Sequence, residues 1–127
     1  MAELIIRYLA AASDNRSHLA SGRMRPEVKR WQEEIAARVC HGVGLRLAGA
    51  PVRLTLTLVR GANTRGRNPD TSNVLKVVQD AVARGLSIDD NQIEAVCKPC
   101  LPFDGCGCRY AQTLWTHLHI GIEERES

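Results

Sequence analysis

Residues 51–60, PVRLTLTLVR, show the clearest alternation in the chain. Polar side chains at every second position separate four apolar ones, Val52, Leu54, Leu56 and Leu58. Side chains of a strand point alternately to the two faces of its sheet, so this pattern predicts a half-buried β-strand. The apolar face of such a strand needs other elements to cover it, and the sequence on both sides supplies them.

An amphipathic helix is predicted on each side of this strand. The first begins near Pro26, whose missing N–H is tolerated in a first helical turn. Its apolar stripe consists of Val28, Trp31, Ile35 and Val39. The second runs from Thr71 to Arg84, and Gly85 is expected to end it. Its apolar side chains are Val74, Val78, Ala81 and Val82.

Three more strands are predicted. One spans residues 4–9, one follows the turn in SIDDNQIEAV (residues 87–96), and one lies in TLWTHLHIGI (residues 113–122). One face of the last strand carries Leu114, Thr116, Leu118, Ile120 and Ile122. The order β, α, β, α, β, β predicts a single α/β (α+β) domain over residues 1–127, with a mixed sheet and two main helices.

The composition is that of an ordinary globular protein of 127 residues with a net charge of +3. Arginine outnumbers lysine, and Arg60, Arg65 and Arg67 lie close together before the second helix. Guanidinium groups suit phosphate, which favours a nucleic-acid partner. The alternative explanation is that the arginine content reflects genomic base composition.

No apolar run is long enough to span a membrane. Glu3 and Arg7 interrupt the N-terminal stretch in a way that is not typical of a signal peptide. We therefore expect a cytoplasmic protein. Its five cysteines are then expected to be reduced or metal-bound, not joined in disulfides.

Residues 68–93 contain four aspartates, Asp70, Asp80, Asp89 and Asp90. On a helical wheel Asn73, Lys76 and Asp80 fall within about 60° of one another, opposite the valines. Hard oxygen ligands from two separate elements are what Mg²⁺ requires. A neighbouring lysine can stabilise negative charge on a phosphate in the transition state.

The same residues have ordinary explanations. Asp70 could simply cap the helix. Lys76 and Asp80, four residues apart, could form a surface ion pair, and two adjacent aspartates are common in turns. The residue pattern alone leaves these explanations open beside metal-dependent phosphate chemistry.

NPDTSNVLKVVQDAV (residues 68–82) followed by IDDNQI (residues 88–93) resembles the signature of RusA-type Holliday junction resolvases. The matching residues are Asp70, Asn73, Lys76, Asp80, Asp89, Asp90, Gln92 and Ile93. SDNR (residues 13–16) also stands where that family has a Ser-x-Asn loop after its first strand, although the family's prolines are missing. The resemblance covers most of the chain up to about Lys98.

The resemblance implies a small homodimeric endonuclease that depends on Mg²⁺ or Mn²⁺ and binds four-way DNA junctions. Such enzymes make paired nicks in opposed strands during DNA recombination and repair. A metal-activated water attacks the phosphodiester and leaves 5′-phosphate and 3′-hydroxyl ends. Members of the family are commonly encoded by phages or prophages.

Carried over to this chain, the resemblance implies that Asp70 and Asp90 are catalytic metal ligands, with Asp89 as a further ligand. Lys76 would stabilise the transition state or position the attacking water. Residues with a supporting role would be Ser72, Asn73 and Asp80. The implied DNA contacts are Asn15, Arg16, Arg65 and Arg67.

Ser72 departs from the family pattern, which has an aspartate there. A hydroxyl is a weaker Mg²⁺ ligand and removes one negative charge. Three interpretations remain. Asp80 or Asp89 supplies the missing carboxylate, Ser72 acts through a water on the metal, or the protein binds branched DNA without cutting it.

Residues 97–108, CKPCLPFDGCGC, are predicted to form a cysteine-rich loop. Thiolates at this spacing could close a tetrahedral structural Zn²⁺ site, with Cys97, Cys100, Cys106 and Cys108 as ligands. The alternatives are a reduced loop without metal and disulfides formed in air.

Two further interpretations concern single side chains. His117 and His119 share one strand face and are interpreted as sheet-surface residues, not ligands. Cys40, at the end of the first helix, is interpreted as a small buried residue.

Overall fold

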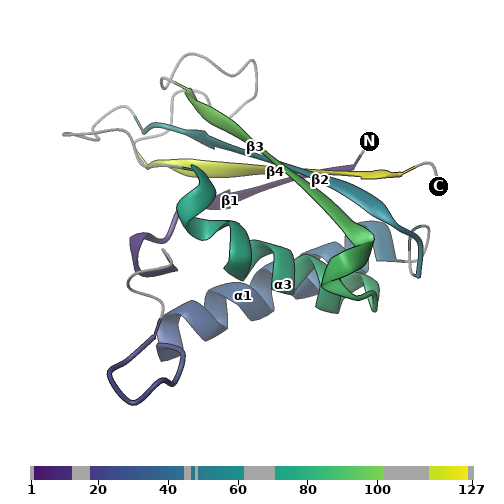
Figure 1. The fold of residues 1–127 in the computed structure, drawn as a ribbon. Coiled ribbons are helices and arrows are strands. Elements are labelled where there is room, and N and C mark those ends of the chain that lie inside the picture. The colour runs from purple at the N-terminus through teal and green to yellow at the C-terminus, as the bar shows by residue number, and fades with distance from the viewer. Residues whose placement is uncertain are drawn as a thin grey trace.

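A computed structural model describes residues 2–12, 18–44, 47, 49–61, 71–101 and 115–125 of the chain. The main elements, in chain order, are β1 (Ala2–Arg7), α1 (Pro26–Val39), β2 (Val52–Val59), α3 (Leu75–Leu86), β3 (Ile93–Leu101) and β4 (His117–Glu124). This order confirms the predicted α+β class, with two main helices and a mixed four-stranded sheet. Both helices lie on the same face of that sheet (Figure 1).

The sheet has the strand order β1-β4-β2-β3. β4 pairs antiparallel with both β1 and β2, whereas β2 and β3 are parallel. Parallel neighbours cannot be joined by a tight turn, so the chain between β2 and β3 crosses over the sheet and contains α3. The crossover therefore places α3 on the same sheet face as α1 (Figure 1).

The alternation predicted for β2 is confirmed. Leu54, Leu56 and Leu58 are fully buried beneath the helices, whereas Arg53, Thr55 and Thr57 are not. The predicted helix stripes are confirmed as well, because every one of their apolar side chains belongs to the core. One continuous core thus lies between the sheet and the two helices.

Gly85 does not end the second helix, which corrects the prediction. The α-helix ends at Leu86, and Ser87 takes the left-handed conformation, with φ of 56°. Gly85 instead lies where α3 crosses α1. A Cβ atom there would lie 2.7 Å from the carbonyl oxygen of Ala36 and 2.9 Å from the Cβ of Val39. The missing side chain allows the two helices to approach each other closely.

Three other predictions are corrected, one on a strand boundary and two on cysteines. β1 spans Ala2–Arg7 instead of residues 4–9, because its pairing with β4 runs from Ala2–Ile122 to Arg7–His117. Cys40 is exposed, because it follows the buried Val39 by one position and so lies about 100° further around the helix. Cys97 and Cys100 belong to β3, not to a loop, because β3 remains paired with β2 as far as Leu101.

We predict that Gly85→Val destabilises the fold by about 1–3 kcal/mol, because the new side chain overlaps α1. The measurement is urea denaturation of the variant and the parent protein. Gly42→Ala is the matched control, since a Cβ at Gly42 meets no atom within 4 Å. Equal unfolding midpoints for Gly85→Val and the parent would contradict the close helix contact.

Candidate active site

The segment that leads into α3 is anchored to the sheet. η3 (Thr71–Val74) is a 3₁₀ turn that begins with the buried Thr71. The Thr71 hydroxyl donates a hydrogen bond of 2.8 Å to the carbonyl oxygen of Lys98 in β3. The next two residues, Ser72 and Asn73, are exposed. Asp70, the first of the predicted metal ligands, immediately precedes Thr71 and lies outside the described residues.

Lys76 and Asp80 lie on the polar side of α3. Lys76 is exposed and Asp80 is half-buried, whereas Val77 and Val78 face the core. The predicted grouping of Asn73 with these two residues assumed one continuous α-helix. Asn73 lies in the 3₁₀ turn, where each residue advances about 120° instead of 100°, so the wheel angle for Asn73 does not hold.

The structure brings Asp80 and Asp90 together from two separate elements. η4 (Asp90–Gln92) follows α3, and the Gln79 amide donates to the backbone carbonyl oxygen of Asp90 at 3.4 Å. The pKa of the Asp80 carboxyl is raised, first by burial and then by the negative charge of Asp90. Two carboxylates that repel each other in this way favour a bound cation.

Two cations oppose this upward shift of the Asp80 pKa. The positive charges of Lys76 and Arg84 both lower it, and each lies four residues from Asp80 along the helix. Lys76 therefore acts electrostatically on Asp80, and its implied role at the scissile phosphate stays a prediction. Arg84 was not among the predicted site residues, although its spacing from Asp80 is visible in the sequence.

Arg84 is held by a residue that the sequence analysis missed. Gln32 of α1 is only 2% exposed, and its amide donates to the Val77 carbonyl oxygen at 3.0 Å. Its side-chain oxygen accepts a hydrogen bond from Arg84 at 3.3 Å. Gln32 lies one position beyond Trp31 in a helix with an apolar stripe, and no local pattern distinguishes it from an exposed glutamine.

Asp89 has a structural role in the turn before β3. Its backbone N–H donates to the side-chain oxygen of Gln92 at 3.1 Å, and the Asp89 side chain in turn accepts from the backbone N–H of Gln92. This reciprocal arrangement is a capping box. Asp89 is exposed, and its position next to Asp90 leaves its role as a metal ligand a prediction.

The donor chemistry suits Mg²⁺, which binds through one or two carboxylates and completes its octahedron with water and phosphate oxygens. Within the described part of the chain, no group of three or more His, Cys, Asp or Glu side chains is arranged to hold a metal ion. Of the predicted ligands, Asp89 and Asp90 lie in that part and Asp70 lies outside it. Asp80, which was predicted in a supporting role, interacts with Asp90.

Several other predicted residues lie outside the described part as well, namely Asn15, Arg16, Arg65, Arg67, Cys106 and Cys108. Described residues on either side of segments 62–70 and 102–114 lie together at one end of the sheet. The Tyr8 N–H donates to the Thr116 carbonyl oxygen, and the Gly61 N–H donates to the Thr116 hydroxyl. Arg60 pairs with Leu101 through a backbone hydrogen bond of 2.8 Å.

Cys97 and Cys100 both pack against the hydrophobic core. Residues three apart on a regular strand face opposite sides, but an irregularity in the pairing adds one residue to β3 between Lys98 and Leu101. Burial raises the pKa of the Cys100 thiol, and the positive charge of Arg60 opposes this. Zinc binding by these cysteines stays a prediction.

The two histidines share one face of β4, as predicted, with ring centroids 5.3 Å apart. His119 is partly exposed, but His117 is only 4% exposed and is therefore not a surface residue. Burial lowers the pKa of both imidazoles, and for His117 the charge of His119 lowers it further. Both rings are accordingly kept neutral to lower pH than an exposed histidine.

No protein-family model matches the chain, and no curated protein matches it. One similar solved structure is the CDP complex of IspF from Plasmodium falciparum, with 14% sequence identity and a TM-score of 0.37. The match covers 74% of this chain and 53% of that one, so this chain spans about half the length of its neighbour. A likeness at this level carries no argument about activity. None of the described helices is long and apolar enough to cross a membrane.

We predict that acid weakens the fold partly through His117. Its folded-state pKa lies below the unfolded value of about 6.5, so the unfolded chain takes up the proton first as the pH falls. The free energy of unfolding should therefore decrease below about pH 6.5. His117→Gln should reduce this decrease in urea titrations, whereas His41→Gln, at an exposed position, should not. An unchanged pH profile for His117→Gln would contradict the assignment.

Proposed function

We propose that this protein is a metal-dependent, structure-selective endonuclease of the RusA type that nicks Holliday junctions or other branched DNA. One observation carries the proposal. Asp80 of α3 and Asp90 of η4, ten residues apart in the sequence, interact electrostatically, and Lys76 acts on the Asp80 carboxyl. A helix face that is simply exposed to solvent gains no stability from a second carboxylate, Asp90, placed beside Asp80.

The residues of this chain would divide the work as follows. Asp70 and Asp90 would hold Mg²⁺ or Mn²⁺, and Asp80 or Asp89 would supply further negative charge. The cation, when bound, would supply a Lewis acid and an activated water for phosphodiester hydrolysis. Lys76, on the exposed side of α3, would approach the scissile phosphate and stabilise its negative charge.

The end of the sheet described above supports a role in DNA binding. The segment that contains Arg65 and Arg67 is bordered in sequence by Gly61, which bonds to Thr116, and by Thr71, which anchors the start of η3 to the adjacent β3. Asn15 and Arg16 come after Tyr8, whose N–H also donates to Thr116. Arginine side chains in these segments would contact phosphates on both sides of the cleavage point. We propose a cytoplasmic homodimer, because two equivalent sites suit a substrate with two equivalent scissile strands.

The first test is cleavage of a labelled four-way junction in Mg²⁺ or Mn²⁺. We predict paired nicks in opposed strands, with no comparable nicking of a linear duplex of the same sequence. Asp70→Asn and Asp90→Asn should each reduce the rate by about a hundredfold or more. Glu33→Gln, which removes an exposed carboxylate from α1, is the matched control and should cut like the parent.

Full activity of Asp90→Asn would overturn the site assignment. Asp89→Ser separates the two roles of Asp89, turn cap and proposed metal ligand, because serine also caps a turn but brings no charge. Loss of cleavage without loss of stability in Asp89→Ser would assign Asp89 as a ligand. Unchanged cleavage would restrict Asp89 to the capping box.

Ser72 favours a second candidate function, a protein that binds branched DNA without cutting it. Ser72 is exposed at the start of η3, where the family has a carboxylate, so the substitution removes one negative charge from the solvent-facing side of the site. For this candidate we predict salt-sensitive junction binding without nicks in any divalent cation.

Ser72→Asp tests the second candidate directly. If the site has lost only this carboxylate, the variant should acquire Mg²⁺-dependent nicking that the parent lacks, as seen on a denaturing gel. Ser72→Asn, which adds similar volume without charge, is the control. A Ser72→Asp variant that binds junctions and still does not cut would contradict a site disarmed by Ser72 alone.

We further propose that the four cysteines bind a structural Zn²⁺. The support is that Cys97 and Cys100 both lie on the core side of β3, at the strand end that leads toward Cys106 and Cys108. A bound zinc would tie this strand end together. Metal analysis of protein purified under reducing conditions, with about one zinc expected per chain, tests the assignment.

A further inference from the structure

One face of the sheet is covered by neither main helix, because α1 and α3 both pack on the other face (Figure 1). This open sheet face carries a hollow of about 470 Å³, whose lining includes Thr57, Lys98 and His119. His117 and His119 are two residues apart on β4, so both side chains point to the open sheet face. Two imidazoles therefore lie next to each other on the same surface of the sheet.

Strand pairing places an apolar side chain beside each imidazole. Val59 of β2, which is fully buried, lies in register with His117. Ile5 of β1 lies in register with His119. These neighbours keep water away from one side of each ring, and a lower local dielectric strengthens the attraction between a ring nitrogen and a cation.

The two rings lean toward each other. Alternate residues of a strand are roughly 6.8 Å apart, at about 3.4 Å per residue. The ring centroids of His117 and His119 are only 5.3 Å apart. The planes of the rings are tilted by 42°, whereas aromatic pairs that pack for their own stability prefer parallel offset or perpendicular arrangements. Ring packing alone therefore does not explain how the two side chains are placed.

The centroid separation of 5.3 Å matches two imidazoles that share one tetrahedral metal ion. Zn²⁺ binds a histidine nitrogen at about 2.0–2.1 Å, which places the ion roughly 3.2 Å from the ring centroid. Two such ligands at the tetrahedral angle have centroids roughly 5.2 Å apart, whereas a right angle between them gives roughly 4.5 Å. Zn²⁺ is the ion that proteins most often hold in tetrahedral geometry.

Hydrogen bonding and burial prepare the two imidazoles to bind such an ion. A hydrogen bond between the His117 ring and the backbone of Trp115 orients that ring. Histidines that bind metals commonly use one ring nitrogen in this way and the other for the metal. Burial lowers the pKa of both imidazoles, so near neutral pH they are in the neutral form that metals require.

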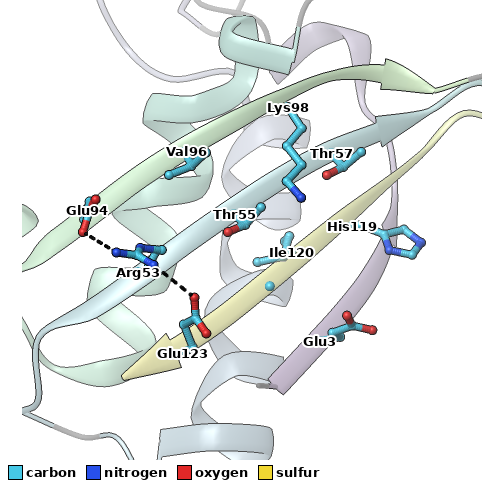
Figure 2. A pocket seen from close by; sticks show the side chains of 11 residues that line it. Glu3, Arg53, Thr55, Thr57, Glu94, Val96, Lys98, His119, Ile120 and Glu123 are labelled. Carbon is cyan, nitrogen blue, oxygen red and sulfur yellow. Dashed lines mark hydrogen bonds and ion pairs between the residues drawn. The ribbon is translucent and has the colours of Figure 1, made fainter. Parts of the chain in front are cut away.

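Glu3 supplies negative charge on the side of His119. Both residues line the hollow, and Figure 2 shows them on the neighbouring strands β1 and β4. The charge of Glu3 raises the pKa of His119 against the effect of burial, so the carboxylate acts on this imidazole. Within the described residues, no third His, Cys, Asp or Glu completes a metal-binding group with the pair. Water in the hollow would therefore complete the coordination.

We propose that His117 and His119 bind Zn²⁺ on the open sheet face, with water as the remaining ligands. The interpretation of both histidines as surface residues without a ligand role gives way to this pairing. The site differs from the proposed Mg²⁺ site, because imidazole suits Zn²⁺ and hard carboxylate oxygen suits Mg²⁺. It also differs from the proposed cysteine site, because Cys97 and Cys100 pack against the core on the other side of the sheet.

A Zn²⁺ titration followed by NMR of the histidine rings tests the proposal. The chain has four histidines, and the other two, His18 and His41, are exposed. We predict that Zn²⁺ shifts the ring signals of His117 and His119 together, at the same concentration. The ring signals of His18 and His41 should remain unchanged, and Mg²⁺ should shift none of the four. The rings report on their own nitrogens, so zinc bound elsewhere by cysteines is distinguished.

His119→Gln tests whether the two imidazoles act together. The variant keeps His117 as the reporter, and its dissociation constant for Zn²⁺ should rise by about tenfold or more, because a single imidazole cannot chelate. His41→Gln is the matched control, since it removes an exposed imidazole, and it should leave the dissociation constant unchanged. Glu3→Gln should weaken binding less than His119→Gln, because it removes charge but no ligand. Circular dichroism would verify that each variant is folded.

Two results would overturn the proposal. One is that the ring signals of His117 and His119 stay unchanged at Zn²⁺ concentrations far above that of the protein. The other is an equal dissociation constant for the parent and His119→Gln. The assay contains no DNA, so its failure is distinguishable from failure of the proposed nuclease function, which junction cleavage measures separately.

Discussion

The parallel pairing of β2 with β3 is the constraint on which the rest of the structure depends. It requires a crossover, and the crossover carries α3 across the sheet beside α1. Three contacts then fix the position of α3. Thr71 binds the β3 backbone, Gln32 binds the α3 backbone at Val77, and Gly85 allows close approach to α1. The same crossover returns the chain to η4, which brings Asp90 beside Asp80.

The electrostatics of the candidate site follow from this arrangement. Burial and the charge of Asp90 both disfavour the ionised form of Asp80, and Lys76 and Arg84 only partly offset them. A helix face that served only solubility would gain nothing from this repulsion. A site for a hard cation would use it, because the bound ion relieves the repulsion between its ligands. Arg84 is in turn held by a hydrogen bond to the buried Gln32 of α1. The contact between the two helices therefore also holds a cation that acts on Asp80.

Periodicity alone predicted the order of elements, the buried face of β2 and the apolar stripes of both helices, because burial of one face leaves a regular trace in sequence. Features that depend on contacts between elements left no such trace. Glycine often ends a helix, but Gly85 lies where α3 crosses α1. Cys97 and Cys100 have the spacing of a metal-binding loop motif, but they lie in a paired strand. The aspartates were identifiable as a set, whereas the electrostatic coupling of Asp80 to Asp90 required the fold.

The proposal that Asp80 on α3 and Asp90 on η4 belong to a divalent-cation site can be tested without a substrate. Mn²⁺ broadens the NMR signals of nearby amides, so a titration of isotopically labelled protein maps where the ion binds. We predict that the amides of Asp80 and Asp90 lose intensity first and that Asp90→Asn abolishes this loss. Uniform broadening, or broadening confined to acidic side chains elsewhere such as Glu94 and Glu123, would contradict it.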